Sequence, residues 1–121
     1  MRRILIVDDE EDILVSLKHL LERNNKEYRV ALARDGEEAW EILKSAPQDL
    51  VILDLAMPKM GGEKLLQLIR SDAAMTDMPV IVSTVTRETS AMVKLMDAGA
   101  TDYLMKPYDI RELTKVIETY I

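Results

Sequence analysis

The segment Asp49–Asp54, with the sequence DLVILD, decides the fold, because it places an unbroken apolar run between two acids. A short run of Leu, Val and Ile without polar alternation is typical of a strand that is buried on both faces. A carboxylate at the end of such a strand has no role in packing. We therefore interpret Asp54 as a chemical group that is displayed at the end of a buried strand.

A second apolar run, Ile4–Val7, also ends in acids, namely Asp8, Asp9 and Glu10. In isolation this acidic cluster is equally well explained as the start of a helix, where negative charge is favourable. Together with Asp54 it indicates that two strands bring carboxylates to one place.

Strand-like and helix-like patterns alternate along the chain. The helical segments, of which Glu11–Asn24 is the first, carry apolar stripes at helical spacing. An alternating pattern with apolar strands predicts an α/β fold of doubly wound (βα)5 type, in which helices cover both faces of a parallel sheet. Strands are predicted over Arg3–Val7, Tyr28–Leu32, Asp49–Asp54, Pro79–Ser83 and Asp102–Met105.

Composition limits the class of protein. A chain of 121 residues with 48% hydrophobic residues fits one domain with an ordinary core. Because cysteine is absent, disulfides, zinc thiolates and thiol catalysis are excluded, and a cytoplasmic location is expected. The net charge of -6 disfavours direct binding of nucleic acid. No apolar run reaches the roughly 20 residues that cross a bilayer, so no membrane association is expected.

The acids favour phosphoryl chemistry. In a sheet of order 2-1-3-4-5, ligands bind where the strand order reverses, between the first and third strands. Carboxylates gathered there repel one another, and Mg²⁺ is the simplest remedy, since it binds carboxylate and phosphate oxygens. Thr84 and Lys106, which follow the fourth and fifth predicted strands, add a hydroxyl and a positive charge. Asp54 is then a candidate nucleophile that forms an aspartyl phosphate.

Several motifs follow one another in order. They are Val7-Asp8-Asp9, Leu53–Pro58 (LDLAMP) with Gly62, Ser83-Thr84, and Gly99–Tyr108 (GATDYLMKPY). Together they resemble the receiver domain of two-component response regulators, in particular the chemotaxis regulators. The resemblance covers essentially the whole chain. It implies one receiver domain over residues 1–121, a flavodoxin-like fold of order 2-1-3-4-5, and a signalling switch that is a phospho-acceptor and not an enzyme.

The resemblance also implies roles for single residues. Asp54 would accept a phosphoryl group from a histidine kinase or a phosphotransfer protein, and Lys106 would pair with the phosphoryl oxygens. Thr84 would move toward the phosphoryl group, and Tyr103 would swing inward with it. The Lys106-Pro107 bond would be cis. Mg²⁺, or Mn²⁺ in its place, would be bound by Asp8 (through water), Asp9, Asp54 and the backbone carbonyl of Ala56.

Further implications concern output and rate. The face made by the fourth helix, fifth strand and fifth helix would change on phosphorylation and regulate a downstream protein or effector domain, with a homodimer through this face as one form of output. Ala56 and Thr86 stand where the family tunes the lifetime of the phosphoryl group. Val85 replaces the alanine or glycine usual in the family, and we expect its branched side chain to narrow the approach to the site.

Two other functions fit parts of the pattern. A Mg²⁺-dependent phosphatase with Asp54 as nucleophile needs a second acid two residues later, where this chain has Ala56. A flavodoxin-like electron carrier needs a Ser-, Thr- and Gly-rich loop after the first strand, where Asp8, Asp9 and Glu10 would repel a flavin phosphate. A colourless purified protein excludes the flavin-bound form.

Overall fold

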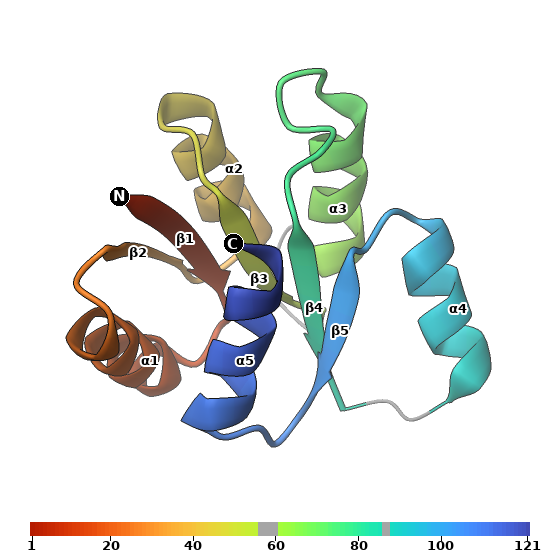
Figure 1. The fold of residues 1–121 in the computed structure, drawn as a ribbon. Helices are drawn as coiled ribbons and strands as arrows, with labels where there is room; N and C mark the ends of the chain where they lie inside the picture. Colours follow the sequence, from red (N-terminus) through yellow and green to blue (C-terminus); the bar gives the residue numbers. More distant parts are fainter. Residues whose placement is uncertain (56–60, 86–87) are drawn as a thin grey trace.

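The structure, a computed structural model, describes residues 1–55, 61–85 and 88–121. The predicted alternation of strands and helices is confirmed (Figure 1). The elements are β1 (Arg2–Val7), α1 (Glu11–Asn24), β2 (Tyr28–Ala33), α2 (Gly36–Ser45), β3 (Leu50–Asp54), α3 (Gly62–Ser71), β4 (Val80–Thr84), α4 (Thr89–Asp97), β5 (Asp102–Met105) and α5 (Ile110–Tyr120).

All neighbouring strands pair in parallel, in the predicted order β2-β1-β3-β4-β5. The chain therefore reverses its direction of winding between β1 and β3, which are hydrogen-bonded neighbours. The carboxyl ends of the strands meet at one edge of the sheet (Figure 1). β4 extends one residue beyond the predicted strand, so Thr84 is the last residue of the strand and does not follow it.

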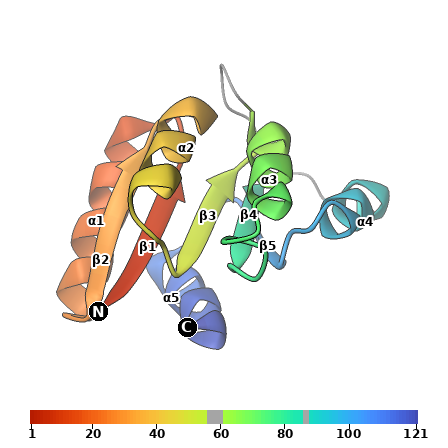
Figure 2. The same cartoon turned by 90° about the horizontal axis from the view of Figure 1, so that it is seen from above.

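Each face of the sheet is covered by its own hydrophobic core. Every residue of β3 is buried, as the unbroken apolar run predicts for a central parallel strand. On one face, alternate strand residues pack against α2, α3 and α4, and on the other face against α1 and α5. Figure 2 shows the sheet between these two groups of helices. The two cores hold the strand ends, and with them the acids, in fixed positions.

Two helices begin with an aspartate cap. The side chain of Asp35 accepts a hydrogen bond from the N–H of Glu38, and Asp109 accepts one from Glu112 at 2.9 Å. Each cap satisfies one N–H group that the first turn of a helix leaves without a partner. The cap at Asp109 sets the start of α5 shortly after Lys106.

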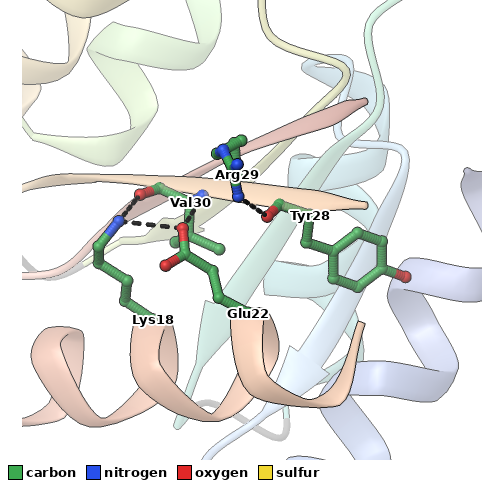
Figure 3. Close-up of polar contacts among 5 residues, drawn as sticks. All are labelled: Lys18, Glu22, Tyr28, Arg29 and Val30. Atoms are coloured by element: carbon green, nitrogen blue, oxygen red, sulfur yellow. Dashed lines mark hydrogen bonds and ion pairs between the residues drawn. The ribbon is translucent and has the colours of Figure 1, made fainter. Parts of the chain in front are cut away.

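Side chains of α1 close the outer edge of β2 at Val30 (Figure 3). The Val30 carbonyl accepts a hydrogen bond of 2.6 Å from Lys18 Nζ, and its N–H donates one of 2.9 Å to Glu22 Oε2. Lys18 and Glu22 also pair with each other at 3.1 Å. We call these three residues the β2 clasp. It occupies backbone groups that would otherwise be available to pair with another strand.

The β2 clasp favours the ionised form of Glu22. The pKa of Glu22 is lowered from its ordinary value, chiefly by the hydrogen bond from the Val30 N–H, while partial burial acts in the opposite direction and Lys18 adds to the lowering. The ion pair is therefore part of the packing of α1 on the sheet.

None of the helices in the described part of the chain is long and apolar enough to cross a membrane.

Candidate functional site

The two predicted acidic strand ends lie at the carboxyl edge of the sheet. Asp54 is the last residue of β3 and is 5% exposed, and Asp8 directly follows β1 and is 2% exposed. The Asp8 side chain accepts a hydrogen bond of 3.0 Å from the N–H of Glu10, which turns the chain toward α1. Asp9 and Glu10 are exposed. Two buried and two solvent-facing carboxylates thus occupy one region.

Lys106 links the two buried carboxylates. Its Nζ lies 3.1 Å from Asp8 Oδ2 and 3.3 Å from Asp54 Oδ2, and its side chain is 20% exposed. The Lys106 N–H donates to the Thr84 carbonyl at 2.8 Å, which sets the lysine beside β4. The Lys106-Pro107 bond is cis, as the family resemblance implied.

The surroundings of Lys106 favour its charged form. Burial alone would lower the pKa of the ammonium group, but the hydrogen bond to Asp8 and the charge of Asp54 outweigh burial, so the pKa of Lys106 is raised. A firmly charged lysine between two carboxylates offsets part of their mutual repulsion.

A hollow of about 250 Å³ opens over these groups. Thr84 is buried in its wall, whereas Val85 is 73% exposed at the rim. The hollow is lined by Asp9, Glu10, Asp54, Leu55, Thr84, Val85 and Lys106. A group bound there would meet a carboxylate, an ammonium group and a hydroxyl, the set that the sequence predicted for this edge.

The acidic groups fit a hard divalent cation. One carboxylate oxygen from each of Asp8, Asp9 and Glu10 lies within 4.8 Å of the others. Oxygen donors at this spacing suit Mg²⁺ or Mn²⁺. Glu10 was not among the predicted metal ligands, although its place beside Asp8 and Asp9 in the sequence was a signal. The predicted carbonyl ligand of Ala56 lies outside the described residues.

The start of α3 packs directly on the backbone of Asp54. A Cβ atom added at Gly62 would lie 2.7 Å from the Asp54 carbonyl oxygen and 2.9 Å from Leu55 Cα. At Gly61 an added Cβ meets nothing within 4 Å. Gly62 thus lets the helix approach the strand end that carries Asp54, which is a reason for glycine at this point of the motif.

Other predicted residues lie farther from the acids or beyond the described chain. Tyr103 stands in β5, paired with Val82, and is 40% exposed on the surface. Its predicted inward movement stays a prediction. Thr86 lies outside the described residues.

Tyr108 is a neighbour of the site to which the sequence gave no role. A mostly apolar hollow of about 440 Å³ adjoins the acids, and Ile13, Leu17, Pro107 and Tyr108 belong to its lining together with Asp8 and Lys106. Burial, and after it the charge of Asp8, raises the pKa of the Tyr108 hydroxyl. The tyrosine therefore stays neutral beside the acids.

Comparison with known proteins agrees with this geometry. The family model described as "Response regulator receiver domain" matches residues 4–118. The response regulator MprA of Mycolicibacterium vanbaalenii is 40% identical over 111 residues, which are 92% of this chain and 46% of that protein. The chain thus spans about half the length of this curated relative.

Solved structures extend the likeness to the fold. Chemotaxis protein CheY4 of Vibrio cholerae superposes with a TM-score of 0.93 at 28% identity, over 100% of this chain and 99% of that one. A CheY-like receiver domain protein of Methanospirillum hungatei superposes with a TM-score of 0.88 at 32% identity, over 98% and 92% of the two chains. The chain belongs to the response regulator receiver domain family, whose members are phosphorylation-controlled switches of two-component signalling.

Proposed function

We propose that Asp54 is the phospho-acceptor of this receiver domain, and that its donor is a histidine kinase or a phosphotransfer protein. The observation that carries the proposal is the contact of Lys106 Nζ with Asp54 Oδ2 at 3.3 Å, beneath an open hollow. An Asp54 oxygen attacks phosphorus while the bond from phosphorus to the histidine nitrogen breaks, and the electron pair of that bond stays on the nitrogen.

The surrounding side chains stabilise the charge that develops on the phosphoryl oxygens. Lys106 supplies a fixed positive charge, and the Thr84 hydroxyl is a hydrogen-bond donor from the wall of the hollow. Lys106 already lies beside Asp54, so its charge needs little reorganisation, whereas Thr84 moves toward the phosphoryl oxygens after transfer. The reaction then depends mainly on positioning, which is what phosphoryl transfer requires.

The reaction needs Mg²⁺ or Mn²⁺. Asp8, Asp9 and Asp54 would hold the ion with the Ala56 carbonyl, and Glu10 is close enough to assist. When bound, the ion neutralises phosphate charge. Asp8 is also a partner of Lys106. The same carboxylate therefore serves the metal side and the lysine side of the site.

The phosphorylated domain acts as a switch. About two negative charges on the phosphate favour a state in which Thr84 and Lys106 contact it and Tyr103 turns inward, so that the α4-β5-α5 face changes. This face then binds a downstream protein, an effector domain or a second copy of the chain. Ala56, Val85 and Thr86 set the rates of phosphorylation and of its loss.

The remaining properties follow from this role. Residues 1–121 form one receiver domain, which acts in the cytoplasm as a phospho-acceptor and not as an enzyme with turnover on a separate substrate. Nucleic acid and membranes are not its direct partners, in keeping with a net charge of -6.

Acetyl phosphate with Mg²⁺, followed by intact mass measurement, tests the assignment. We expect a gain of about 80 Da in the parent protein, from one phosphoryl group. Asp54→Asn abolishes this gain, whereas the control Asp97→Asn, at an exposed position in α4, keeps it. Removal of divalent metal by a chelator also abolishes labelling. Label that survives in Asp54→Asn refutes the proposed function.

A further inference from the structure

Arg70, in the last turn of α3, joins three separate parts of the chain at the edge of the sheet opposite the acids. Its Nε donates to the Gly99 carbonyl at 2.7 Å, and its Nη2 donates to Thr101 Oγ1 at 3.2 Å. Its Nη1 donates to the carbonyls of Met75 (3.3 Å), Thr76 (3.1 Å) and Met78 (2.8 Å). We call this set of contacts the Arg70 hub. Hydrogen bonds from a charged donor are stronger than neutral ones.

Gly99 is shaped to receive this arginine. Its φ of +108° is a conformation that favours glycine, and an added Cβ would lie 2.7 Å from Arg70 Cγ. Thr101 extends the hub to β4, because its Oγ1 also accepts from the Val80 N–H at 3.0 Å. The Arg70 hub therefore rests on the sheet itself.

The hub holds the carboxyl end of α4. The N–H groups of Ala98, Gly99 and Ala100 donate back to the last carbonyls of the helix, those of Lys94, Met96 and Leu95. The chain from the end of α4 to Gly99 is thus folded tightly onto the helix, and Arg70 fixes this turn to α3. Movement of this end of α4 would break contacts with a charged donor.

The remainder of α4 is held weakly. Among its residues, all of which the structure describes, Leu95 alone is buried, and it lies in the carboxyl-terminal half. Val93 and Met96 are exposed. In both views α4 stands at the rim of the domain beside β5 (Figures 1 and 2). α3, by comparison, buries Gly62, Leu65, Leu66 and Ile69.

We propose that Arg70 is the pivot of α4: it fixes the carboxyl end of the helix, so that a change at Thr84 moves the amino end and tilts the helix. This inference rests on the proposed function, because the phosphoryl group on Asp54 supplies the change. A nine-residue helix is about 13 Å long. A shift of about 2 Å at its amino end, the size of helix shifts in switching proteins, would tilt it by roughly 8°. Such a tilt reorients the exposed Val93 and Met96 without sliding the helix along the sheet.

Arg70→Met tests the pivot, since methionine keeps an apolar stem and removes every donor. The control is Arg23→Met, at an exposed arginine in the last turn of α1. Hydrogen exchange is measured at the amides of Ala98, Gly99 and Ala100 and compared with the core strand β3. We expect exchange at these three amides to rise by at least about tenfold relative to β3 in Arg70→Met, and to stay parental in the control.

A second measurement follows the change that a phosphoryl mimic causes in α4. Beryllofluoride with Mg²⁺, a phosphoryl mimic, is added while amide chemical shifts are recorded. In Arg70→Met we expect parental shift changes next to Asp54 and altered or broadened changes along Thr89–Asp97. Labelling by acetyl phosphate, read by mass, is expected to match the parent, because Arg70 lies at the opposite edge of the sheet from the acids.

The outcomes separate the two proposals. A parent protein that takes no label refutes the proposed function. A labelled parent, with parental exchange at Ala98–Ala100 or parental shifts along α4 in Arg70→Met, overturns the pivot. Exchange that rises equally in β3 also overturns it, because Arg70 then only stabilises the whole domain. Should Arg70→Met fail to fold, Arg70→Lys, which lacks the planar fork of donors, is judged by the same two measurements.

Discussion

Gly62→Ala tests whether the start of α3 positions Asp54. The added Cβ would lie 2.7 Å from the Asp54 carbonyl oxygen and 2.9 Å from Leu55 Cα, both backbone atoms that cannot rotate away. Relief requires a displacement of about 0.6–0.8 Å, because nonbonded contacts are comfortable near 3.5 Å. Overpacking of this kind costs about 1–3 kcal/mol. We expect the free energy of unfolding, measured with urea, to fall by that amount.

The same displacement moves Asp54, the proposed nucleophile. A misplacement of about 1 Å costs roughly a hundredfold in rate, so a displacement of about 0.6–0.8 Å should slow labelling of Asp54 by acetyl phosphate by about tenfold or more. Gly61→Ala is the matched control, because an added Cβ there meets nothing within 4 Å. The reasoning is refuted if Gly62→Ala and Gly61→Ala have equal stability and equal labelling rates.

Three further changes test other contacts. Glu22→Ala removes the acceptor of the Val30 N–H and should cost about 1–2 kcal/mol in urea unfolding. The folded pKa of Glu22 lies below its ordinary 4.5. The parent should therefore be more stable than Glu22→Gln above pH 4.5, and this difference in stability should vanish as the pH falls through the lowered pKa of Glu22. A stability difference that is unchanged well below that pKa contradicts the β2 clasp. Lys106→Met removes the cation between two buried carboxylates and should cost about 1–3 kcal/mol in urea unfolding at pH 7; a stability equal to that of the parent argues against charge compensation. Val85→Ala opens the rim of the hollow and should speed acetyl phosphate labelling of Asp54, or loss of the label, by roughly twofold or more, and parental rates for both reactions count against this role.

The strand ends were predictable because they depend on local pattern. The position of Asp54 was predicted from an apolar run of strand length that ends at an acid. The predicted parallel strand order then placed Asp8 near it. Thr84 was expected after the strand, but a backbone hydrogen bond from Lys106 to its carbonyl extends the pairing by one residue. Such an extension depends on the neighbouring strand and is not visible in the sequence of β4.

Contacts between distant elements escaped sequence reasoning. Arg70 contacts Gly99 and Thr101, which lie about 30 positions later in the chain. From the sequence, an arginine at the end of an amphipathic helix is expected to be an ordinary exposed residue. The pairing of Lys18 and Glu22 at helical spacing was readable, but their use of Val30 was not. Apart from the Thr101 hydroxyl, the partners of these side chains are backbone groups, which carry no residue-type signal.

Lys106 gives the unphosphorylated protein an internal placeholder. Its ammonium group already lies beside Asp8 and Asp54 at 3.1 and 3.3 Å, so part of the repulsion between these carboxylates is offset at rest. In the proposed function, an arriving phosphoryl group replaces a carboxylate as the partner of the lysine, and its departure restores the carboxylate. In this proposal the lysine keeps an anionic partner in both states, so the resting contact can form again after each message.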